Sequence, residues 1–95
     1  MPYNIQLTDY VARVELTVRE SLRGARVIAL IESDIHGDEG YWERVYYVAW
    51  QRTDQCGTHR VCIDSKWHQA CFIGHYDMTV DQALRDMIDR TTLTL

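Results

Sequence analysis

The chain has 95 residues, of which 46% are hydrophobic and 25% charged, and its formal net charge at pH 7 is −4. This length suits one core, so we expect residues 1–95 to form a single domain. The acidic balance argues against direct nucleic-acid binding, which normally uses a basic face. No apolar run approaches the roughly 20 residues that cross a bilayer, and the N-terminus lacks a secretory signal. Together with an odd number of cysteines, three, this favours a cytoplasmic, thiol-reducing location.

The first segment has two overlapping signals. From Tyr10 to Arg19 apolar and polar residues alternate, which is strand periodicity broken only at Val11. Thr17 is followed three residues later by Glu20, a pattern typical of a capped helix start. We therefore predict a strand that passes into a helix at Thr17.

That helix would continue to about Ser33. A competing interpretation makes Gly24 a turn and Arg26 to Ile31 a second strand. Residues 27–31 are a continuous apolar run, and periodicity cannot separate a buried strand from a buried helix there. The two interpretations stay open.

The later elements are easier to assign. Strands are expected over Tyr41–Gln51, His59–Asp64 and Gln69–Tyr76, separated by turns that contain Gly and Asp. A helix is expected over Val80–Arg90, where the Thr-x-x-Gln pattern of residues 79–82 predicts a capping box. The fold class is α+β: an antiparallel sheet of about four strands with one or two helices packed on one face.

An acidic loop follows the apolar run. It contains four candidate partner-binding residues, Glu32, Asp34, Asp38 and Glu39. Such a loop can face a basic site on a nucleic-acid-handling protein, because charge complementarity speeds association and fixes register. Its Asp-x-His-Gly sequence at 34–37 resembles the first metal-binding motif of calcineurin-like metallophosphoesterases, which implies a two-metal site. The later motifs of that family are missing apart from a Gly-His pair at 74–75.

An aromatic strand supplies the second set of candidate partner-binding residues. One face of this strand carries Trp42, Arg44, Tyr46 and Trp50. With helices on only one side of the sheet, we expect this face to be near solvent, and its residue types are those enriched in binding hot spots. Alternatively, this face is buried against a second copy of the chain in a homodimer.

A Cys/His cluster provides the alternative chemistry. Cys56, His59, His68 and Cys71 are the candidate zinc ligands, with Cys62 available to a thiol-dependent site. Residues three apart on a strand point to opposite faces, so only a turn at 56–59 makes the first pair plausible. In the other interpretation these residues belong to a hairpin with its turn near 65–68, and Cys62 lies opposite Cys71 as a small buried thiol.

The residues assemble no nucleophile, base and stabiliser, so we predict a protein-binding domain that is not an enzyme and needs no cofactor. A short, acidic, single-domain α+β chain is similar in format to the small inhibitors made by phages and mobile elements, anti-CRISPR proteins among them. That resemblance implies a CRISPR effector or another bacterial defence or nucleic-acid-binding protein as partner. The alternative is a small zinc-stabilised or thiol-dependent module that uses the Cys/His cluster.

Overall fold

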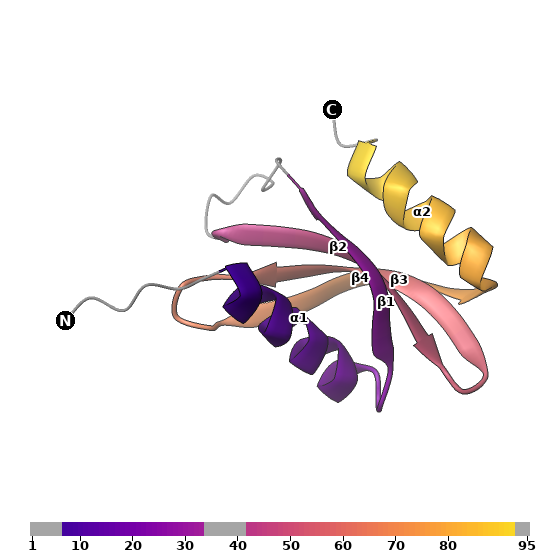
Figure 1. Ribbon diagram of the computed structural model, residues 1–95, viewed down its shortest axis with the longest axis horizontal. Coiled ribbons are helices and arrows are strands. Elements are labelled where there is room, and N and C mark those ends of the chain that lie inside the picture. The colour runs from indigo at the N-terminus through magenta and orange to yellow at the C-terminus, as the bar shows by residue number, and fades with distance from the viewer. Residues whose placement is uncertain (1–6, 34–41, 93–95) are drawn as a thin grey trace.

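The computed structural model describes residues 7–33 and 42–92. Its elements in chain order are α1 (Leu7–Ser21), β1 (Arg26–Ser33), β2 (Arg44–Arg52), β3 (Gln55–Ile63), β4 (Gln69–Met78) and α2 (Val80–Thr92). The strands form one antiparallel sheet in the order β1-β2-β3-β4, so each strand pairs with its neighbours in the chain (Figure 1). The predicted α+β class is confirmed. No helix in the described ranges is long and apolar enough to span a membrane.

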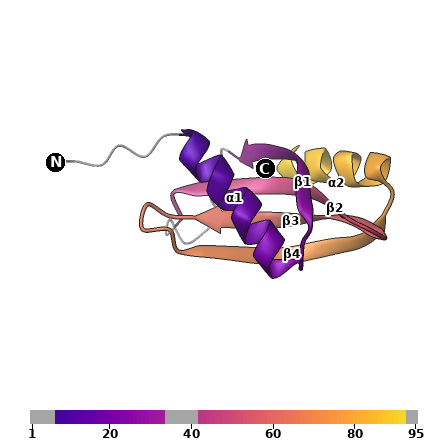
Figure 2. The ribbon, with the colours of Figure 1, turned by 60° about the horizontal axis from the view of Figure 1, so that its bottom comes forward.

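The positions of the helices follow from β2, which is apolar on both faces. One face packs beneath α1 in the α1-side core, which consists of Tyr10, Val14, Val18, Leu22, Ala25, Tyr46, Val48, Trp50, Val61 and Ile63. The other face packs beneath α2 in the α2-side core, which consists of Val45, Tyr47, Ala49, Cys56, Cys62, Ala83 and Met87. The helices therefore cover opposite faces of the sheet (Figure 2), and the expectation that they share one face is corrected. Each apolar face of β2 has to be removed from water, and one layer of helices cannot cover both.

The segment predicted to be a strand that passes into a helix is helix α1, so that prediction is wrong. The residues that α1 and the turn after it bury recur every four positions: Tyr10, Val14, Val18 and Leu22. Positions four apart are also an even number apart, so the same apolar residues fit both the two-residue period of a strand and the period of a helix. A short segment therefore could not separate the two. Thr17 caps no helix start, because it lies inside α1 and its hydroxyl donates to the carbonyl of Arg13 (2.7 Å).

The competing interpretation of residues 24–31 is confirmed. Gly24 has a φ of 87°, a left-handed conformation that glycine adopts without a steric penalty. Its N–H donates to the carbonyl of Arg19 (2.9 Å) and closes the end of α1. The apolar run then forms β1, which pairs with β2 along its length apart from a bulge between Val27 and Ala29.

The hairpin between β3 and β4 is one residue out of the predicted register. The Asp64 carboxylate accepts the N–H groups of Lys66 and His68 (2.9 Å each), and Trp67 has a φ of 63°. Cys62 therefore pairs with Ala70 and not with Cys71. A shift of one residue changes every pairing across the ladder, so Cys71 lies opposite Val61 and the expected pairing of the two cysteines is wrong.

The capping box at the start of α2 is confirmed. The Thr79 N–H donates to the Gln82 side-chain oxygen (2.9 Å), and the Gln82 N–H donates to the Thr79 hydroxyl (3.1 Å). Two N–H groups that have no partner within the helix are satisfied reciprocally.

We expect Thr79→Ala to lower the free energy of unfolding by about 1 kcal/mol, because the cap loses its acceptor. Thr79→Ser is the matched control, since it keeps the hydroxyl, and it should stay within about 0.5 kcal/mol of the parent. Urea denaturation of the three proteins measures the difference. An alanine variant as stable as the serine variant would contradict this role for the cap.

Candidate functional site

The predicted aromatic face is mostly interior. Trp50 and Tyr46 are 0% and 1% exposed in the α1-side core, so the expectation that they lie near solvent is wrong. Trp42 is half-buried against the α2-side core. Asp34, Asp38 and Glu39 lie outside the described residues. Of the predicted binding residues, Glu32, Trp42 and Arg44 remain accessible in part.

Glu32 and Arg44 are paired with each other. Arg44 Nη1 donates to both carboxylate oxygens of Glu32 (2.8 and 3.0 Å). The same guanidinium lies over the ring of Tyr10, 4.8 Å from its centroid. The acidic charge of Glu32 is therefore compensated within the chain, which weakens its use as a mimic of nucleic-acid charge.

The structure does not bring the candidate zinc ligands together. Cys56 belongs to the α2-side core, while His59 lies on the α1 side of the same strand. Cys71 packs against the α1-side core, and His68 lies in the hairpin turn, where its ring bonds the Asp64 carboxylate (2.9 Å). Among the described residues no group of three or more potential ligands is close enough to hold a metal ion.

The cysteines are also poorly placed for thiol chemistry. All three are thiols, and Cys56 and Cys62 are buried. Burial, together with a smaller effect of the nearby Cys62, raises the pKa of Cys71 to about 11. A thiol is nucleophilic as its thiolate, so Cys71 is almost unreactive at neutral pH.

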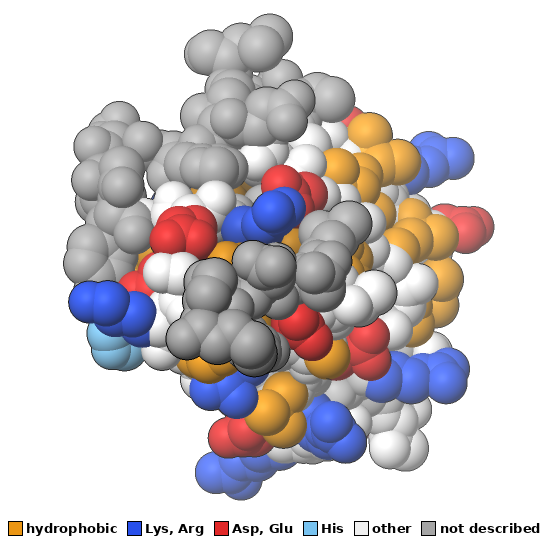
Figure 3. Space-filling view, turned by 60° about the vertical axis from the view of Figure 1, so that its left-hand side comes forward, with side chains coloured by type: hydrophobic (Ala, Val, Ile, Leu, Met, Phe, Trp, Pro, Cys, Tyr) orange, Lys and Arg blue, Asp and Glu red, His pale blue; other side chains and the backbone are white. Residues whose placement is uncertain are grey.

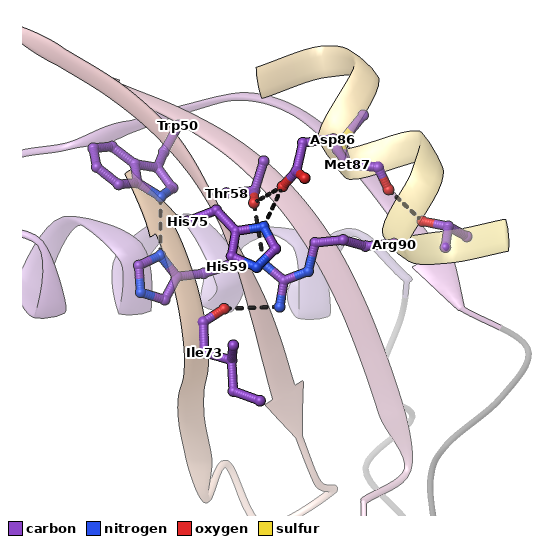
Figure 4. A network of polar contacts seen from close by, with 9 residues as sticks. Trp50, Thr58, His59, Ile73, His75, Asp86, Met87 and Arg90 are labelled. Carbon is purple, nitrogen blue, oxygen red and sulfur yellow. Dashed lines mark hydrogen bonds and ion pairs between the residues drawn. The ribbon is translucent and has the colours of Figure 1, made fainter. Parts of the chain in front are cut away.

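The structure instead gathers polar residues around two bulges in β4. Along β3, the partners of Arg60, Thr58 and Cys56 step by two, but along β4 they are residues 72, 75 and 78, which step by three. Each interval therefore contains one extra residue in β4. The bulges turn His75 toward α2, so that it lies beside residues of that helix (Figure 4).

His75 and α2 are joined through Asp86. Asp86 Oδ2 accepts from His75 Nδ1 (2.7 Å) and from the Thr58 hydroxyl (2.5 Å). Arg90, one turn further along α2, donates to the Thr58 hydroxyl (3.0 Å) and to the carbonyl of Ile73 (2.7 Å). Although burial opposes its ionisation, the bonds from Thr58 and His75 and the charge of Arg90 hold the pKa of Asp86 below its usual value. This network fastens the bulged part of β4 to α2.

A second chain of hydrogen bonds reaches β4 from the interior. Trp50 donates its indole N–H to His59 Nδ1 (2.9 Å), and His59 Nε2 lies 3.1 Å from the Tyr76 hydroxyl. Burial, followed by the charges of Arg90 and His75, lowers the pKa of His59 to about 4, so its ring is neutral at pH 7. Since Nδ1 is an acceptor, Nε2 carries the proton and donates it to the Tyr76 oxygen.

Gly74 is required at this point because its neighbours occupy the space of a side chain. A Cβ there would lie 2.4 Å from two atoms of the His59 ring and 2.6 Å from the Tyr76 hydroxyl. Across the ladder, a Cβ at Gly57 would lie 2.2 Å from the carbonyl oxygen of His75. The two glycines let β4 lie against His59 and against β3.

Between the two networks, exposed residues are held in fixed positions. Ile73 is 72% exposed and has a φ of 39°, a conformation that β-branched residues rarely adopt. Tyr76 is 46% exposed, and its ring packs edge-on against Trp50 and His59. We call Ile73, His75 and Tyr76 the bulged edge. The sequence analysis missed it, and its one signal was a glycine inside the predicted strand 69–76.

The polar network binds and positions side chains, and it contains no attacking group. Thr58 is the hydroxyl nearest the His75–Asp86 pair, but it is fully buried and donates to the same carboxylate. A nucleophile needs a base as its proton acceptor and access to substrate.

No protein-family model, curated protein or solved structure matches this chain. A function for this chain is therefore inferred from the geometry of the described residues.

We expect Gly74→Ala to lower the free energy of unfolding by about 2 kcal/mol or more, because the new methyl group overlaps the His59 ring. Gly24→Ala is the control. It has open space around it and a positive φ, so only the backbone cost of about 1 kcal/mol applies. Equal losses in the two variants, measured by urea denaturation, would show that the contact with His59 is not tight.

The depressed pKa of His59 makes stability depend on pH. In the unfolded chain His59 binds a proton near its ordinary pKa of 6.5, whereas in the folded chain it does so only near 4. The unfolded state therefore binds more protons between these values. The free energy of unfolding should fall by up to about 3 kcal/mol as the pH drops from 7 toward 4.

His59→Gln removes this titration and should flatten the pH dependence in that window. Urea denaturation at pH 7 and pH 4.5 in both proteins gives the comparison, and the same loss in both would contradict the assignment. Asp86 does not affect this comparison, because its pKa is held below 3.8. Its contribution to the free energy of unfolding is lost only at lower pH.

Proposed function

We propose that this chain is a non-enzymatic protein-binding domain of the cytoplasm and that the bulged edge is its contact surface. The observation that carries the proposal is Ile73, an exposed aliphatic residue held in a strained backbone conformation. Strain of this kind costs about 1–3 kcal/mol, and it is concentrated where function requires it. The burial of Ile73 against a partner would offset that cost.

Tyr76 gives the surface a directed polar group. Its oxygen accepts the proton of His59 Nε2, so its own hydrogen is available to an acceptor outside the chain. Its ring is fixed by Trp50 and His59, and little side-chain freedom is lost on binding. Rigid aromatic groups next to apolar ones are typical of binding hot spots.

The partner class follows from these two residues. A matching surface would present an apolar recess for Ile73 and a carbonyl or carboxylate oxygen for the Tyr76 hydroxyl. A network fixed before binding raises affinity, because the ordering cost is met when the chain folds.

The narrower idea of a phage or mobile-element inhibitor, acting on a bacterial defence or nucleic-acid-handling protein, stays a prediction. The net charge of −4 supports a basic partner. On the face shown in Figure 3, however, acidic side chains are interspersed with Lys and Arg among the described residues. Glu32, Trp42 and Arg44 would form a second contact area in that case.

Ile73→Asn separates binding from stability. Asn tolerates positive φ, so we expect the variant to gain about 1 kcal/mol in the free energy of unfolding. The partner would lose its aliphatic anchor, and its affinity should fall at least tenfold, or about 1.4 kcal/mol. A variant that gains stability and binds as before would show that the strain has no role in binding.

The binding measurement uses the full chain immobilised and exposed to a lysate of cells that carry the gene. Ile88→Asn is the matched control, because Ile88 is also exposed but lies on α2. Proteins retained by the parent and the control but lost from Ile73→Asn support the bulged edge. Tyr76→Phe, which keeps the ring, should weaken the same proteins. Retention of every protein by all variants, or capture of none by the parent, would overturn the proposal.

A further inference from the structure

A recess opens at one end of the sheet, between two turns. It lies between Gly24, in the turn that leads from α1 to β1, and Thr53, in the turn that joins β2 to β3. Arg26, Gln51 and Arg52 complete its lining. Its volume is about 340 Å³, near the lower end of the range of about 300–1,000 Å³ that is typical of small-molecule sites. The recess therefore suits a small ligand or the terminal group of a larger one.

The lining is rich in hydrogen-bond donors and has no acidic side chain. Each of its four side chains carries at least one N–H or O–H group, and two of the four are guanidinium groups. Gln51 uses its amide oxygen to accept from Arg26 Nη2 (3.1 Å), so its NH₂ group is available to a ligand. Asp54, the next residue in the turn, is exposed and does not line the recess. These donors require a ligand that accepts hydrogen bonds, and the two positive charges favour an anion.

The two arginines of the recess are paired only with neutral oxygens. Arg26 donates to the amide oxygen of Gln51. Arg52 donates from Nη1 to the carbonyl of Leu22 (3.2 Å) and from Nη2 to the side-chain oxygen of Gln55 (2.5 Å). Neither arginine forms an ion pair with an acidic residue in the described part of the chain. Their two charges are therefore not neutralised by these contacts.

Arg52 is held in position before any ligand binds. Its two hydrogen bonds fix the guanidinium, which also lies over the ring of Trp50, 5.3 Å from its centroid. Nη1 and Nη2 each keep a second hydrogen for a ligand. The Nε–H group is buried and has no partner, so part of the cost of burying this cation is not offset within the chain. An anion beside the same guanidinium would offset it, and little side-chain freedom would be lost on binding.

The directions of the two arginines favour phosphate over carboxylate. Arg26 pairs with Gln51 and lies on the α2 side of the sheet, whereas Arg52 lies on the α1 side with Trp50. The two side chains therefore reach the recess from different directions. A carboxylate has two oxygens in one plane, and one planar guanidinium satisfies both. A phosphate group has its oxygens arranged tetrahedrally, so it can bind two guanidinium groups, and its charge of about −1.5 to −2 at pH 7 matches them.

We propose that this recess is a binding site for a phosphate group, held by charge-assisted hydrogen bonds from Arg26, Gln51 and Arg52. The ligand is free phosphate or a small phosphate monoester. The chain's net charge of −4 repels anions at long range, but salt screens exposed charges beyond about 8 Å under physiological conditions, so the contacts in the recess decide the affinity. The recess shares no residue with the bulged edge, and its test is independent of the proposed function.

The test is an NMR titration of the nitrogen-15-labelled full chain with sodium phosphate at pH 7, with sodium chloride adjusted to keep the ionic strength constant. We expect saturable shifts of the backbone N–H signals of residues 24–26 and 51–53. Sodium acetate is the carboxylate arm and should bind at least about tenfold more weakly. Phosphoserine and adenosine monophosphate carry the same group on different molecules, and the tightest binding among these two and free phosphate identifies the source of the ligand.

Variants separate the recess from the general charge of the chain. Arg26→Gln removes one charge from the lining and should raise the dissociation constant for phosphate at least about tenfold. Arg85→Gln is the matched control, because it removes the same charge from an exposed position on α2, and it should stay within about twofold of the parent. Arg52→Lys keeps the charge but loses the planar arrangement of donors, and it should weaken binding at least about fivefold.

Three results would overturn the proposal. The first is the absence of saturation up to about 10 mM phosphate, which is weaker than specific association normally is. The second is acetate binding as tight as phosphate binding. The third is an equal loss in Arg26→Gln and Arg85→Gln. Because Arg26 is exposed, its variant still gives this comparison if Arg52→Lys does not fold.

Discussion

The fold depends on the burial of both faces of β2. Alternation along a strand sends successive side chains to opposite sides, and in β2 both sets are apolar. Tyr46, Val48 and Trp50 require a layer on one side, and Val45, Tyr47 and Ala49 require another. α1 and α2 provide these layers from the two ends of the described chain, and the strands between them form a meander that keeps β2 and β3 inside. The positions of the sheet edges, and so of the bulged edge, follow from this constraint.

The sequence predicted the structure correctly where a single hydrophobic periodicity or a single local pair of hydrogen bonds decides it. The capping box at Thr79 and Gln82 needs only residues three apart, and the strand pattern from residue 44 onward has no competing helical pattern. Tyr10, Val14 and Val18 satisfied both periods, so tertiary packing decided between them. The same Thr-x-x-Glu pattern at Thr17 failed, because the helix had already begun ten residues earlier, at Leu7. Where a helix begins depends on the whole segment that forms it, and a four-residue motif alone does not decide it.

The candidate site could not have been predicted in the same way. The three-residue steps of the Cys/His cluster suggested a metal site, but on a regular strand they alternate between faces, as Cys56 and His59 do. Three-residue steps share a face only where a bulge adds one residue, and this happens in β4 at His75. Bulges depend on contacts with the opposite strand and with α2, which no local pattern in the sequence records. Gly74 marks the place without stating its geometry.

The two sheet edges differ in regularity, because β4 has two bulges and β1 has one near its start. At β1, the strand pairs regularly with β2 from Ala29 to Ser33, and its aliphatic residues 27–31 remove apolar area from water by packing against both cores. At the β4 edge, the neutral buried His59 of the neighbouring strand β3 and the strained Ile73 of β4 are costs that other folded contacts offset. The result is a surface that cannot pair as a regular strand.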